Sequence, residues 1–485
     1  MQAGRVYSYE RRRPEETTLY RVVQDNLETL YEAVEEGAVA LSLPQFVKSE
    51  LEGYLECGML CRGFARLRCG ECAETRLVAF SCKGRGFCPS CLGRKMSATA
   101  LNLEEAVMPR APLRQWVLTL PYPWRKRLGY DGKLLSALTR MFVRTVHAFY
   151  TERTGGESGA VCVVQRTQGD LRLNPHLHVV FVDGGYCEEE GGEVKFEGLG
   201  HLRTREVGEV LERAVVKMRK YLARRGLLQE REEPEEARGH AELCGSAASG
   251  EWAPAGPQWK KKDEKEGPRP LSFVAKTELV VEGALVAKKD GFTVHAATCV
   301  GADDAGGRER LLRYILRPPF AQERVQKTAE GLVRIALKKR WSDGTVAVEM
   351  DPLSLLCRLA ASVPPPRFHM VRYSGVVASA SKLRSRVVPK PPPKPPPDAK
   401  DAEHVHVGSR YIPWAELMMR TFKLDVLECP RCRGRMKLLA MVTELGEVRR
   451  FLDGLDVASA LPERTPARGP PYWQSKALRR LAGAA

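Results

Sequence analysis

Two histidines one residue apart are the first candidates for chemistry in this chain. His176 and His178 begin a run whose second half, residues 179–182, is apolar and mostly β-branched, which predicts a buried strand. Residues i and i+2 of a strand point to the same face, so both imidazoles should project together. That geometry suits two ligands of one metal ion, although hydrogen bonds alone could also satisfy a histidine pair at a strand entrance.

A second pattern predicts a structural zinc site. The pairs Cys69-x-x-Cys72 and Cys88-x-x-Cys91 are separated by 15 residues, a spacing typical of a tetrahedral four-thiolate site. Zinc would supply folding energy that so short a segment otherwise lacks. Lys83 and Arg85 lie between the pairs, so we expect this module to contact nucleic acid; a zinc site with a merely solvated basic surface is the alternative.

Five further cysteines lie near or resemble this pattern. Cys57, Cys61 and Cys82 have weaker spacing, and we interpret them as packing thiols. A single knuckle, Cys429-Pro-Arg-Cys432, is half a zinc site. It could pair with His404 and His406, pair with another chain, or hold two reduced thiols.

Charge and composition limit the class of protein. The chain has 485 residues, 77 Lys and Arg against 60 Asp and Glu, a net charge of +17 and a pI near 9.3. Such an excess indicates a polyanionic partner, most simply nucleic acid, with a merely soluble basic protein as the alternative. No apolar run reaches about 18 residues, so we expect no membrane span. The N-terminus lacks the apolar core of a signal peptide. We therefore expect a cytoplasmic protein, with its 14 cysteines reduced or bound to metal.

The elements around these residues predict a multidomain α+β protein. Helices are expected over 18–36, 44–54, 134–150 and 206–227, and strands over 115–120, 160–165, 278–281, 284–287 and 292–296. We divide the chain into a zinc-binding domain (15–110), a sheet domain (111–345) with an irregular insertion at about 229–270, a helical segment with a proline-rich linker (346–400), and a C-terminal region (401–485).

Three segments together resemble one family. They are residues 69–91 with their cysteines, the His176-Leu-His178 strand, and Arg313-Tyr314-Ile-Leu-Arg317-Pro-Pro-Phe. They resemble the rolling-circle transposases of the insertion-sequence-ninety-one family, and the tail around Cys429 and Cys432 does so too. The resemblance implies an N-terminal zinc-binding domain and a single-strand endonuclease domain of the "HUH" type, built on a central antiparallel sheet flanked by helices.

The resemblance also implies a tyrosine nucleophile that stays attached to a 5′ phosphate of DNA, and Tyr314 matches that position. Some relatives carry two tyrosines four residues apart, but here Arg310 and Pro318 stand four residues before and after Tyr314. The chain therefore resembles the single-tyrosine branch. The alternative for Tyr314 is an ordinary half-buried tyrosine. DNA contacts are expected from basic residues beside Tyr314 and in the zinc module: Arg310, Arg313, Arg317, Lys83 and Arg85.

The expected chemistry needs a divalent ion, Mg²⁺ or Mn²⁺, in addition to the structural Zn²⁺. Held by His176 and His178, this ion would polarise the scissile phosphate. A third ligand must come from elsewhere. His295 is our candidate, with Asp183, Gln165 and water as alternatives, and His295 could simply be a packed strand histidine.

Other functions remain open from the sequence. A plasmid relaxase or replication initiator would use the same chemistry, and a non-catalytic zinc-dependent DNA-binding protein would use none of it. The expected substrate is single-stranded DNA or the hairpin ends of a mobile element, and the protein could self-associate.

Overall fold

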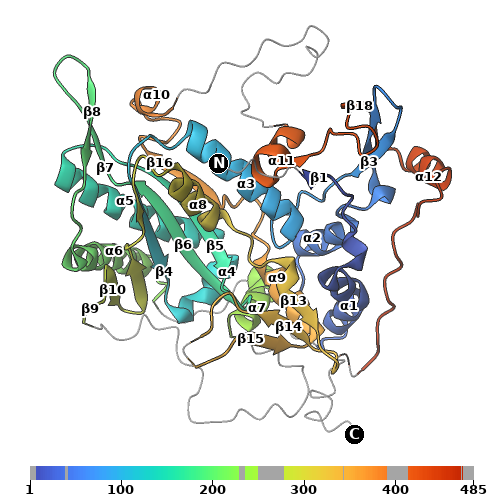
Figure 1. The fold of residues 1–485 in the computed structure, drawn as a ribbon. Coiled ribbons are helices and arrows are strands. Elements are labelled where there is room, and N and C mark those ends of the chain that lie inside the picture. Colours follow the sequence, from blue (N-terminus) through green and yellow to red (C-terminus); the bar gives the residue numbers. More distant parts are fainter. Residues whose placement is uncertain are drawn as a thin grey trace.

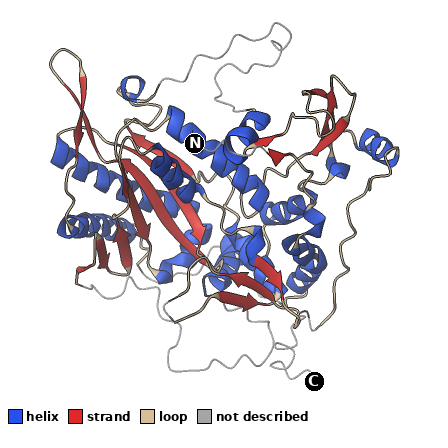
Figure 2. Cartoon of the chain, viewed as in Figure 1, coloured by secondary structure: helices blue, strands red, loops and turns tan. Residues whose placement is uncertain are grey.

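The computed structural model describes residues 7–38, 42–228, 235–249, 278–341, 343–389, 413–470 and 472. A long sheet lies on one side of the molecule, with helices on both of its faces and smaller sheets beside it (Figure 1). The same view coloured by secondary structure shows helices and strands mixed throughout (Figure 2). The predicted α+β class is confirmed.

The long sheet carries the histidine pair. Its strand order is β16-β5-β6-β4-β11-β10-β9, with β12 paired to β4, and all its pairs are antiparallel. Its strands are β4 (Leu113–Thr119), β5 (Gly159–Thr167), β6 (Leu173–Val182), β9 (Val280–Glu282), β10 (Val286–Lys289), β11 (Phe292–His295), β12 (Cys299–Val300) and β16 (Val371–Gly375).

Both faces of this sheet are covered, which explains why β6 is apolar along most of its length. On one face Leu177 and Phe181 join a core with α5 (Gly132–Thr154) and α6 (Thr204–Arg224). On the other face Val180 and Val182 pack with residues of α3 (Pro89–Ala106) and α8 (Ala305–Leu316). The histidines share the face of Val180 because residues i and i+2 point the same way.

Helix α8 carries Tyr314. Asp304 caps its N-terminus by accepting a hydrogen bond from the Gly307 N–H at 2.7 Å. Pro318, just after the helix, cannot continue it. Leu311, Leu312 and Ile315 are buried, and this orientation leaves Tyr314 39% exposed at the end of the helix.

Strands from the N-terminal and C-terminal parts of the chain pair with one another beside the sheet domain. Strands β2 (Phe64–Cys69) and β3 (Thr75–Ala79) form a sheet with β18 (Met436–Val442), which pairs antiparallel with β2. Nearby, β1 (Tyr7–Ser8) pairs with β17 (Leu424–Asp425). Figure 1 shows the red C-terminal elements against the blue N-terminal ones. The other elements here are α1 (Thr18–Glu35), α2 (Gln45–Glu56), α11 (Trp414–Phe422) and α12 (Leu445–Asp453).

The remaining elements complete the sheet domain and its junction with the zinc region. They are α4 (Arg125–Tyr130), β7 (Gly184–Glu188), β8 (Val194–Gly198), α7 (Glu235–Ser249), β13 (Val325–Lys327), β14 (Val333–Ala336), β15 (Ala347–Met350), α9 (Pro352–Ser362) and α10 (Arg384–Val387). In the described part of the chain, no helix combines the length and apolar character needed to cross a membrane.

Helix α7 corrects one expectation. It occupies 235–249, inside the segment predicted to be irregular, and its Ala241, Leu243 and Cys244 are fully buried. The surrounding Glu, Gly and Ala residues concealed this short apolar face. The rest of the 229–270 segment, the proline-rich linker after Pro389, and His404 and His406 lie outside the described residues.

Candidate functional site

The histidine pair and the tyrosine come together although they are far apart in sequence. The rings of His176 and His178, on adjacent same-face positions of β6, lie 5.0 Å apart between centroids. The Tyr314 ring meets His178 edge to face at 5.7 Å. Strand β6 and helix α8 thus bring together the three residues that the sequence singled out for chemistry.

Both imidazoles have one nitrogen in use and the other one free. His176 Nδ1 lies 2.6 Å from the Asn174 carbonyl oxygen, so Nδ1 must carry the proton and Nε2 is unprotonated in the neutral ring. His178 Nδ1 lies 2.6 Å from the Gln115 side-chain amide. Its Nε2 is buried and has no hydrogen-bond partner. Buried polar atoms normally have a hydrogen-bond partner, so this unpartnered nitrogen is available to coordinate a metal ion.

Burial keeps both rings neutral. It lowers the pKa of His176 to about 4, opposed by its hydrogen bond to Asn174 and aided by the charge of Arg317. Burial also lowers the pKa of His178 to about 2, with the neighbouring His176 and Arg317 adding to the effect. Neutral imidazole is the form that binds a metal ion.

Gln115 is a functional candidate that the sequence reasoning missed. It is 3% exposed on β4, where its side chain reaches His178. If its amide is turned so that the oxygen accepts from Nδ1–H, His178 Nε2 becomes the free lone pair. The signal was a polar residue at the start of the apolar strand 115–120.

The proposed third ligand, His295, does not join the pair. Strand register places His178 opposite Val117, and Val117 opposite His295. His295 therefore shares the face but stands two strands away, about 10 Å. Among the described residues, the groups of three or more His, Cys, Asp or Glu that could hold an ion are both made of cysteines. The alternative Asp183 is also engaged, since both its oxygens accept from Arg114 at 2.8 Å.

Gln165 lies closer to the histidines than His295 does. It stands directly opposite His176 on the neighbouring strand β5, and its Nε2 donates to the Ile315 carbonyl at 2.8 Å. This hydrogen bond connects the sheet to the last turn of α8, one residue after Tyr314. The Gln165 side chain therefore lies on the same face of the sheet as His176, next to the last turn of α8.

The cysteines form two clusters, and they differ from the single site predicted from the sequence. Cys88 and Cys91 lie with Cys57 and Cys82, while Cys69 and Cys72 lie with Cys429 and Cys432. Within each cluster all four sulfurs lie within 4.8 Å of one another. The predicted set of Cys69, Cys72, Cys88 and Cys91 is therefore split between two places, because the β2–β3 hairpin carries its knuckle away from α3.

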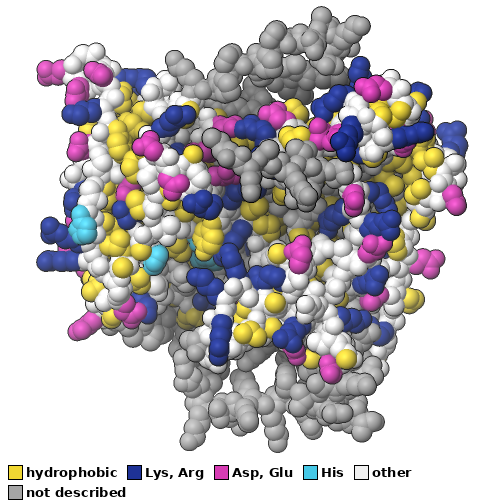
Figure 3. Space-filling model, viewed as in Figure 1, with side chains coloured by type: hydrophobic (Ala, Val, Ile, Leu, Met, Phe, Trp, Pro, Cys, Tyr) yellow, Lys and Arg dark blue, Asp and Glu magenta, His cyan; other side chains and the backbone are white. Residues whose placement is uncertain are grey.

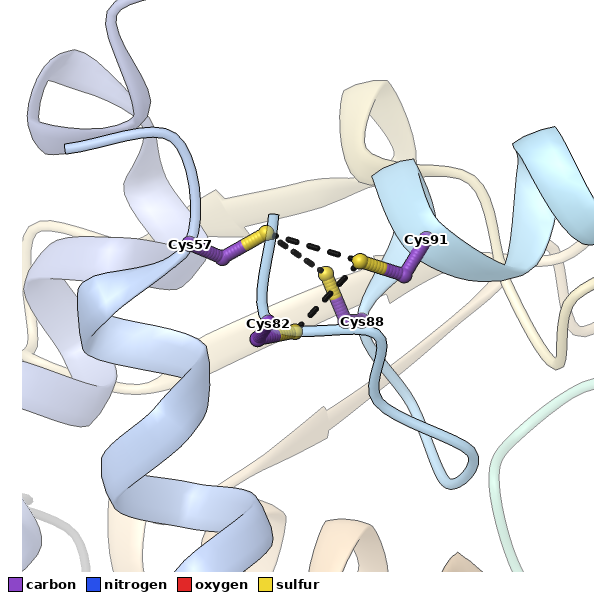
Figure 4. A group of neighbouring side chains, drawn as sticks. All are labelled: Cys57, Cys82, Cys88 and Cys91. Carbon is purple, nitrogen blue, oxygen red and sulfur yellow. Dashed lines mark hydrogen bonds between the residues drawn. The ribbon is translucent and has the colours of Figure 1, made fainter. Parts of the chain in front are cut away.

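The first cluster is built into the main core (Figure 4). Cys57 ends α2, Cys82 lies in the loop after β3, and Cys88 and Cys91 begin α3. The sulfur of Cys57 lies 3.6 Å from those of Cys88 and Cys91, and the sulfurs of Cys82 and Cys91 are 3.4 Å apart. Cys57 and Cys82 are thus cluster members, not the packing thiols that their spacing suggested; of the three, Cys61 alone lies outside both clusters.

Comparison with protein families gave two matches. A family described as "Putative transposase" matches residues 159–384, and one described as "Transposase zinc-binding domain" matches residues 27–120. The chain belongs to the insertion-sequence-ninety-one family of transposases. It is a DNA-processing enzyme of DNA transposition, with DNA as its partner and Zn²⁺ supported by the cysteine clusters. Comparison with curated proteins gave no match, and neither did comparison with solved structures.

The two matched regions of this transposase contain different candidate sites. The putative-transposase match contains His176, His178 and Tyr314, while the zinc-domain match contains all of the first cysteine cluster. The second cluster is only half covered, since Cys429 and Cys432 lie beyond both matches.

Basic side chains of the transposase surround Tyr314. The Arg317 guanidinium lies 4.3 Å from the centre of the Tyr314 ring, and the Lys338 ammonium lies 5.6 Å from it. Lys338 was not foreseen, because it follows β14 and nothing local marks it. Arg313 turns instead towards Glu309 and Ser97. Arg310 is exposed one turn before Tyr314.

A pocket of about 550 Å³ lies next to this corner. Its wall joins the zinc region to the sheet domain, and Gln165 and Arg317 belong to it. Its other basic residues are Arg85, Lys95, Arg166 and Arg367. Figure 3 shows Lys and Arg side chains gathered near the middle of the drawn face. Of the two basic residues predicted to contact DNA from the zinc region, Arg85 lines the pocket and Lys83 is exposed outside its lining.

Proposed function

We propose that this transposase nicks and rejoins single-stranded DNA through a covalent 5′-phosphotyrosine on Tyr314, in rolling-circle-type transposition. One observation carries the proposal. A half-exposed tyrosine lies against a buried histidine whose Nε2 has no partner. A nucleophile beside an available metal ligand, at the edge of a basic pocket, is the arrangement that phosphoryl transfer needs.

The proposed step exchanges one phosphate ester for another. The Tyr314 phenolic oxygen attacks the scissile phosphorus, the bond from phosphorus to the 3′ oxygen breaks, and the phenolic proton ends on the released 3′ hydroxyl. The phosphotyrosine retains the ester's energy, so a later 3′ hydroxyl can attack it and restore the tyrosine. Rejoining therefore needs no nucleoside triphosphate.

The residues fit a divalent ion, Mg²⁺ or Mn²⁺, at the histidine pair. His176 and His178 would bind through their Nε2 atoms, which hydrogen bonds at Nδ1 leave free. We propose the Gln165 side-chain oxygen as the third ligand in place of His295, because Gln165 faces His176 directly. The bound ion would withdraw electron density from the phosphate.

Basic residues would guide the strand to Tyr314. We propose that the phosphate backbone follows the pocket past Arg85 and Lys95 to Arg317, whose guanidinium already lies over the Tyr314 ring. Arg310, Arg313 and Lys83 would contribute long-range attraction. Because neutralised phosphates release counterions, binding should weaken steeply with salt.

The decisive experiment compares the formation of a covalent DNA adduct by the wild-type protein and by Tyr314→Phe. The wild-type protein, incubated with single-stranded DNA and Mn²⁺, should give a protein–DNA adduct on a denaturing gel, and peptide mass spectrometry should locate it on Tyr314. Tyr314→Phe should form no adduct but bind DNA as well as the wild type, because only one hydroxyl is lost.

Tyr373→Phe is the matched control, since Tyr373 is 42% exposed and lies on β16. It should form adduct normally. DNA binding without adduct in the wild type would favour the non-catalytic DNA-binding alternative. An adduct on any other tyrosine would refute the assignment of the nucleophile. A relaxase or replication initiator would share the adduct, and cleavage confined to the ends of a mobile element would separate the transposase from both.

A further inference from the structure

The second cysteine cluster has the dimensions of a metal site. The sulfurs of Cys69 and Cys432 are 3.5 Å apart, and those of Cys72 and Cys429 are 3.6 Å apart. In a tetrahedral four-thiolate site with zinc–sulfur bonds of about 2.3 Å, neighbouring sulfurs lie about 3.8 Å apart. Disulfide sulfurs would be at about 2.05 Å. The observed distances therefore match four thiolates around one ion and do not match two disulfides.

The two halves of this cluster have the same local conformation. In each knuckle the N–H of the first cysteine donates to the carbonyl five residues ahead, from Cys69 to Glu74 at 2.8 Å and from Cys429 to Gly434 at 2.9 Å. In each, the residue after the second cysteine has positive φ, 58° at Ala73 and 61° at Arg433. Non-glycine residues adopt this conformation only where the surroundings require it. Two such residues at equivalent places indicate two knuckles shaped for one ion.

The elements around the cluster need such an ion. The local core contains five buried residues, two of them cysteines of the cluster itself: Leu67, Cys69, Val78, Cys429 and Met436. On β18, Leu438 and Met441 are each 59% exposed, so this strand buries little apolar surface in the sheet. Small domains with so little core usually depend on a metal or a disulfide.

We propose that Cys69, Cys72, Cys429 and Cys432 bind a second Zn²⁺, which fastens the C-terminal strand β18 to the N-terminal strand β2. The ligands come from chain positions 357 and 363 residues apart. The transposase domain is thus inserted between the two halves of one zinc ribbon. This site is independent of the catalytic proposal, since it involves neither Tyr314 nor the histidine pair.

The first test counts zinc in the intact chain by native mass spectrometry. The wild type should carry two Zn²⁺ per chain, and Cys432→Ser should carry one. Cys432→His should still carry two, because a Cys₃His set also binds zinc. Cys299→Ser is the matched control, an exposed cysteine outside both clusters, and it should carry two.

Two outcomes would overturn the proposal: one Zn²⁺ in the wild type, or two in Cys432→Ser. Zinc found only in a dimer, shared between chains, would overturn the intrachain fastening. Cys88→Ser tests the first cluster separately, since it should lose one Zn²⁺ while the second is kept.

A second test asks whether the ion holds β18 in place. Hydrogen exchange of the backbone amides of 436–442 should be about 100-fold faster in Cys432→Ser than in the wild type, because the strand opens without its anchor. Exchange in α5, far from the cluster, should be unchanged, and Cys432→His should restore slow exchange. Equal protection of β18 in Cys432→Ser and wild type would show that the cluster does not fasten the strand.

Discussion

The cysteine clusters and the histidine pair are two kinds of candidate metal site, and they differ in the number of ligands that they offer. Each cysteine cluster offers four sulfurs, enough to fill the tetrahedral coordination of a zinc ion. The histidine pair offers two free nitrogens beside a pocket and a tyrosine. Closed sites hold a fold together, whereas sites with open positions leave room for substrate. The difference in ligand number therefore separates a structural role from a chemical one.

The two regions also keep their ligands ready in different ways. Hydrogen bonds from the N–H groups of Cys72 and Glu71 lower the pKa of Cys69 to about 7, because they stabilise the thiolate. The histidines depend on the opposite effect: burial disfavours their charged form and so keeps the rings neutral. Donated hydrogen bonds thus favour the anionic form of Cys69, whereas burial favours the neutral form of the two imidazoles.

The largest expected effect comes from opening the first cysteine cluster. Cys88→Ser should lower the free energy of unfolding by about 4 kcal/mol or more, since losing a structural metal belongs to the most severe class of substitution. Cys88 is 1% exposed in the main core. Urea unfolding together with zinc analysis measures this. If Cys88→Ser lacks one zinc but unfolds with the same free energy as the wild type, this cluster has no structural role.

Next in size is the effect of emptying the histidine site. His178→Ala should reduce DNA cleavage about 100- to 1,000-fold, the usual result of losing one electrostatic contributor to a transition state, while the zinc content stays at the wild-type value. Excess Mn²⁺ should restore part of the cleavage by mass action. A parallel loss of zinc would mean that the two regions are not independent.

A smaller effect is expected from Gln115→Leu, which removes the group that orients His178. The Mn²⁺ concentration for half-maximal cleavage should rise about 10- to 100-fold, the usual cost of losing a hydrogen bond to a metal ligand. The cleavage rate at saturating Mn²⁺ should change little. Gln326→Leu is the control, because Gln326 is an exposed glutamine on β13 with no part in the proposed site. An unchanged metal requirement in Gln115→Leu would assign the residue to packing alone.

The smallest effect should be that of mild acid on the histidine site. Because both pKa values are lowered, to about 4 and about 2, neither ring gains a proton between pH 8 and pH 6. The Mn²⁺ requirement should therefore change less than about 2-fold across that range. Exposed histidines, with a pKa of about 6.5, would compete with the metal increasingly below pH 7. A tenfold rise by pH 6 would show that the pair is not shielded.

Much of the candidate site around Tyr314 could be predicted because the sequence patterns that indicate it are local. The apolar, mostly β-branched run at 179–182 predicted the strand of His176 and His178, and β6 confirms it. The resemblance to a family then connected these pieces. Gln115 and Lys338 could not be found in this way, since their roles depend on strand register and on a loop that only the folded chain brings near Tyr314.

The cysteines show where sequence spacing misleads. Two Cys-x-x-Cys pairs 15 residues apart satisfied the spacing rule for one site, yet the hairpin between β2 and β3 directs Cys69 and Cys72 towards the C-terminal knuckle. Spacing describes what a segment could do alone. It does not reveal a partner more than 300 residues away, so the sequence around Cys429 and Cys432 could not decide between a metal site and two reduced thiols.

The pairing of β18 with β2 has a consequence for how the protein is made. The hairpin carrying Cys69 leaves the ribosome early, and at a synthesis rate of about 5–20 residues per second its partners follow roughly 20–70 s later. Until then two thiols of the nascent chain face solvent or a chaperone, open to oxidation. The sheet closes only after translation has passed Cys432. A chain interrupted anywhere before that point would keep an unfilled knuckle, a chemical mark by which the cell's quality control could distinguish it from a finished molecule.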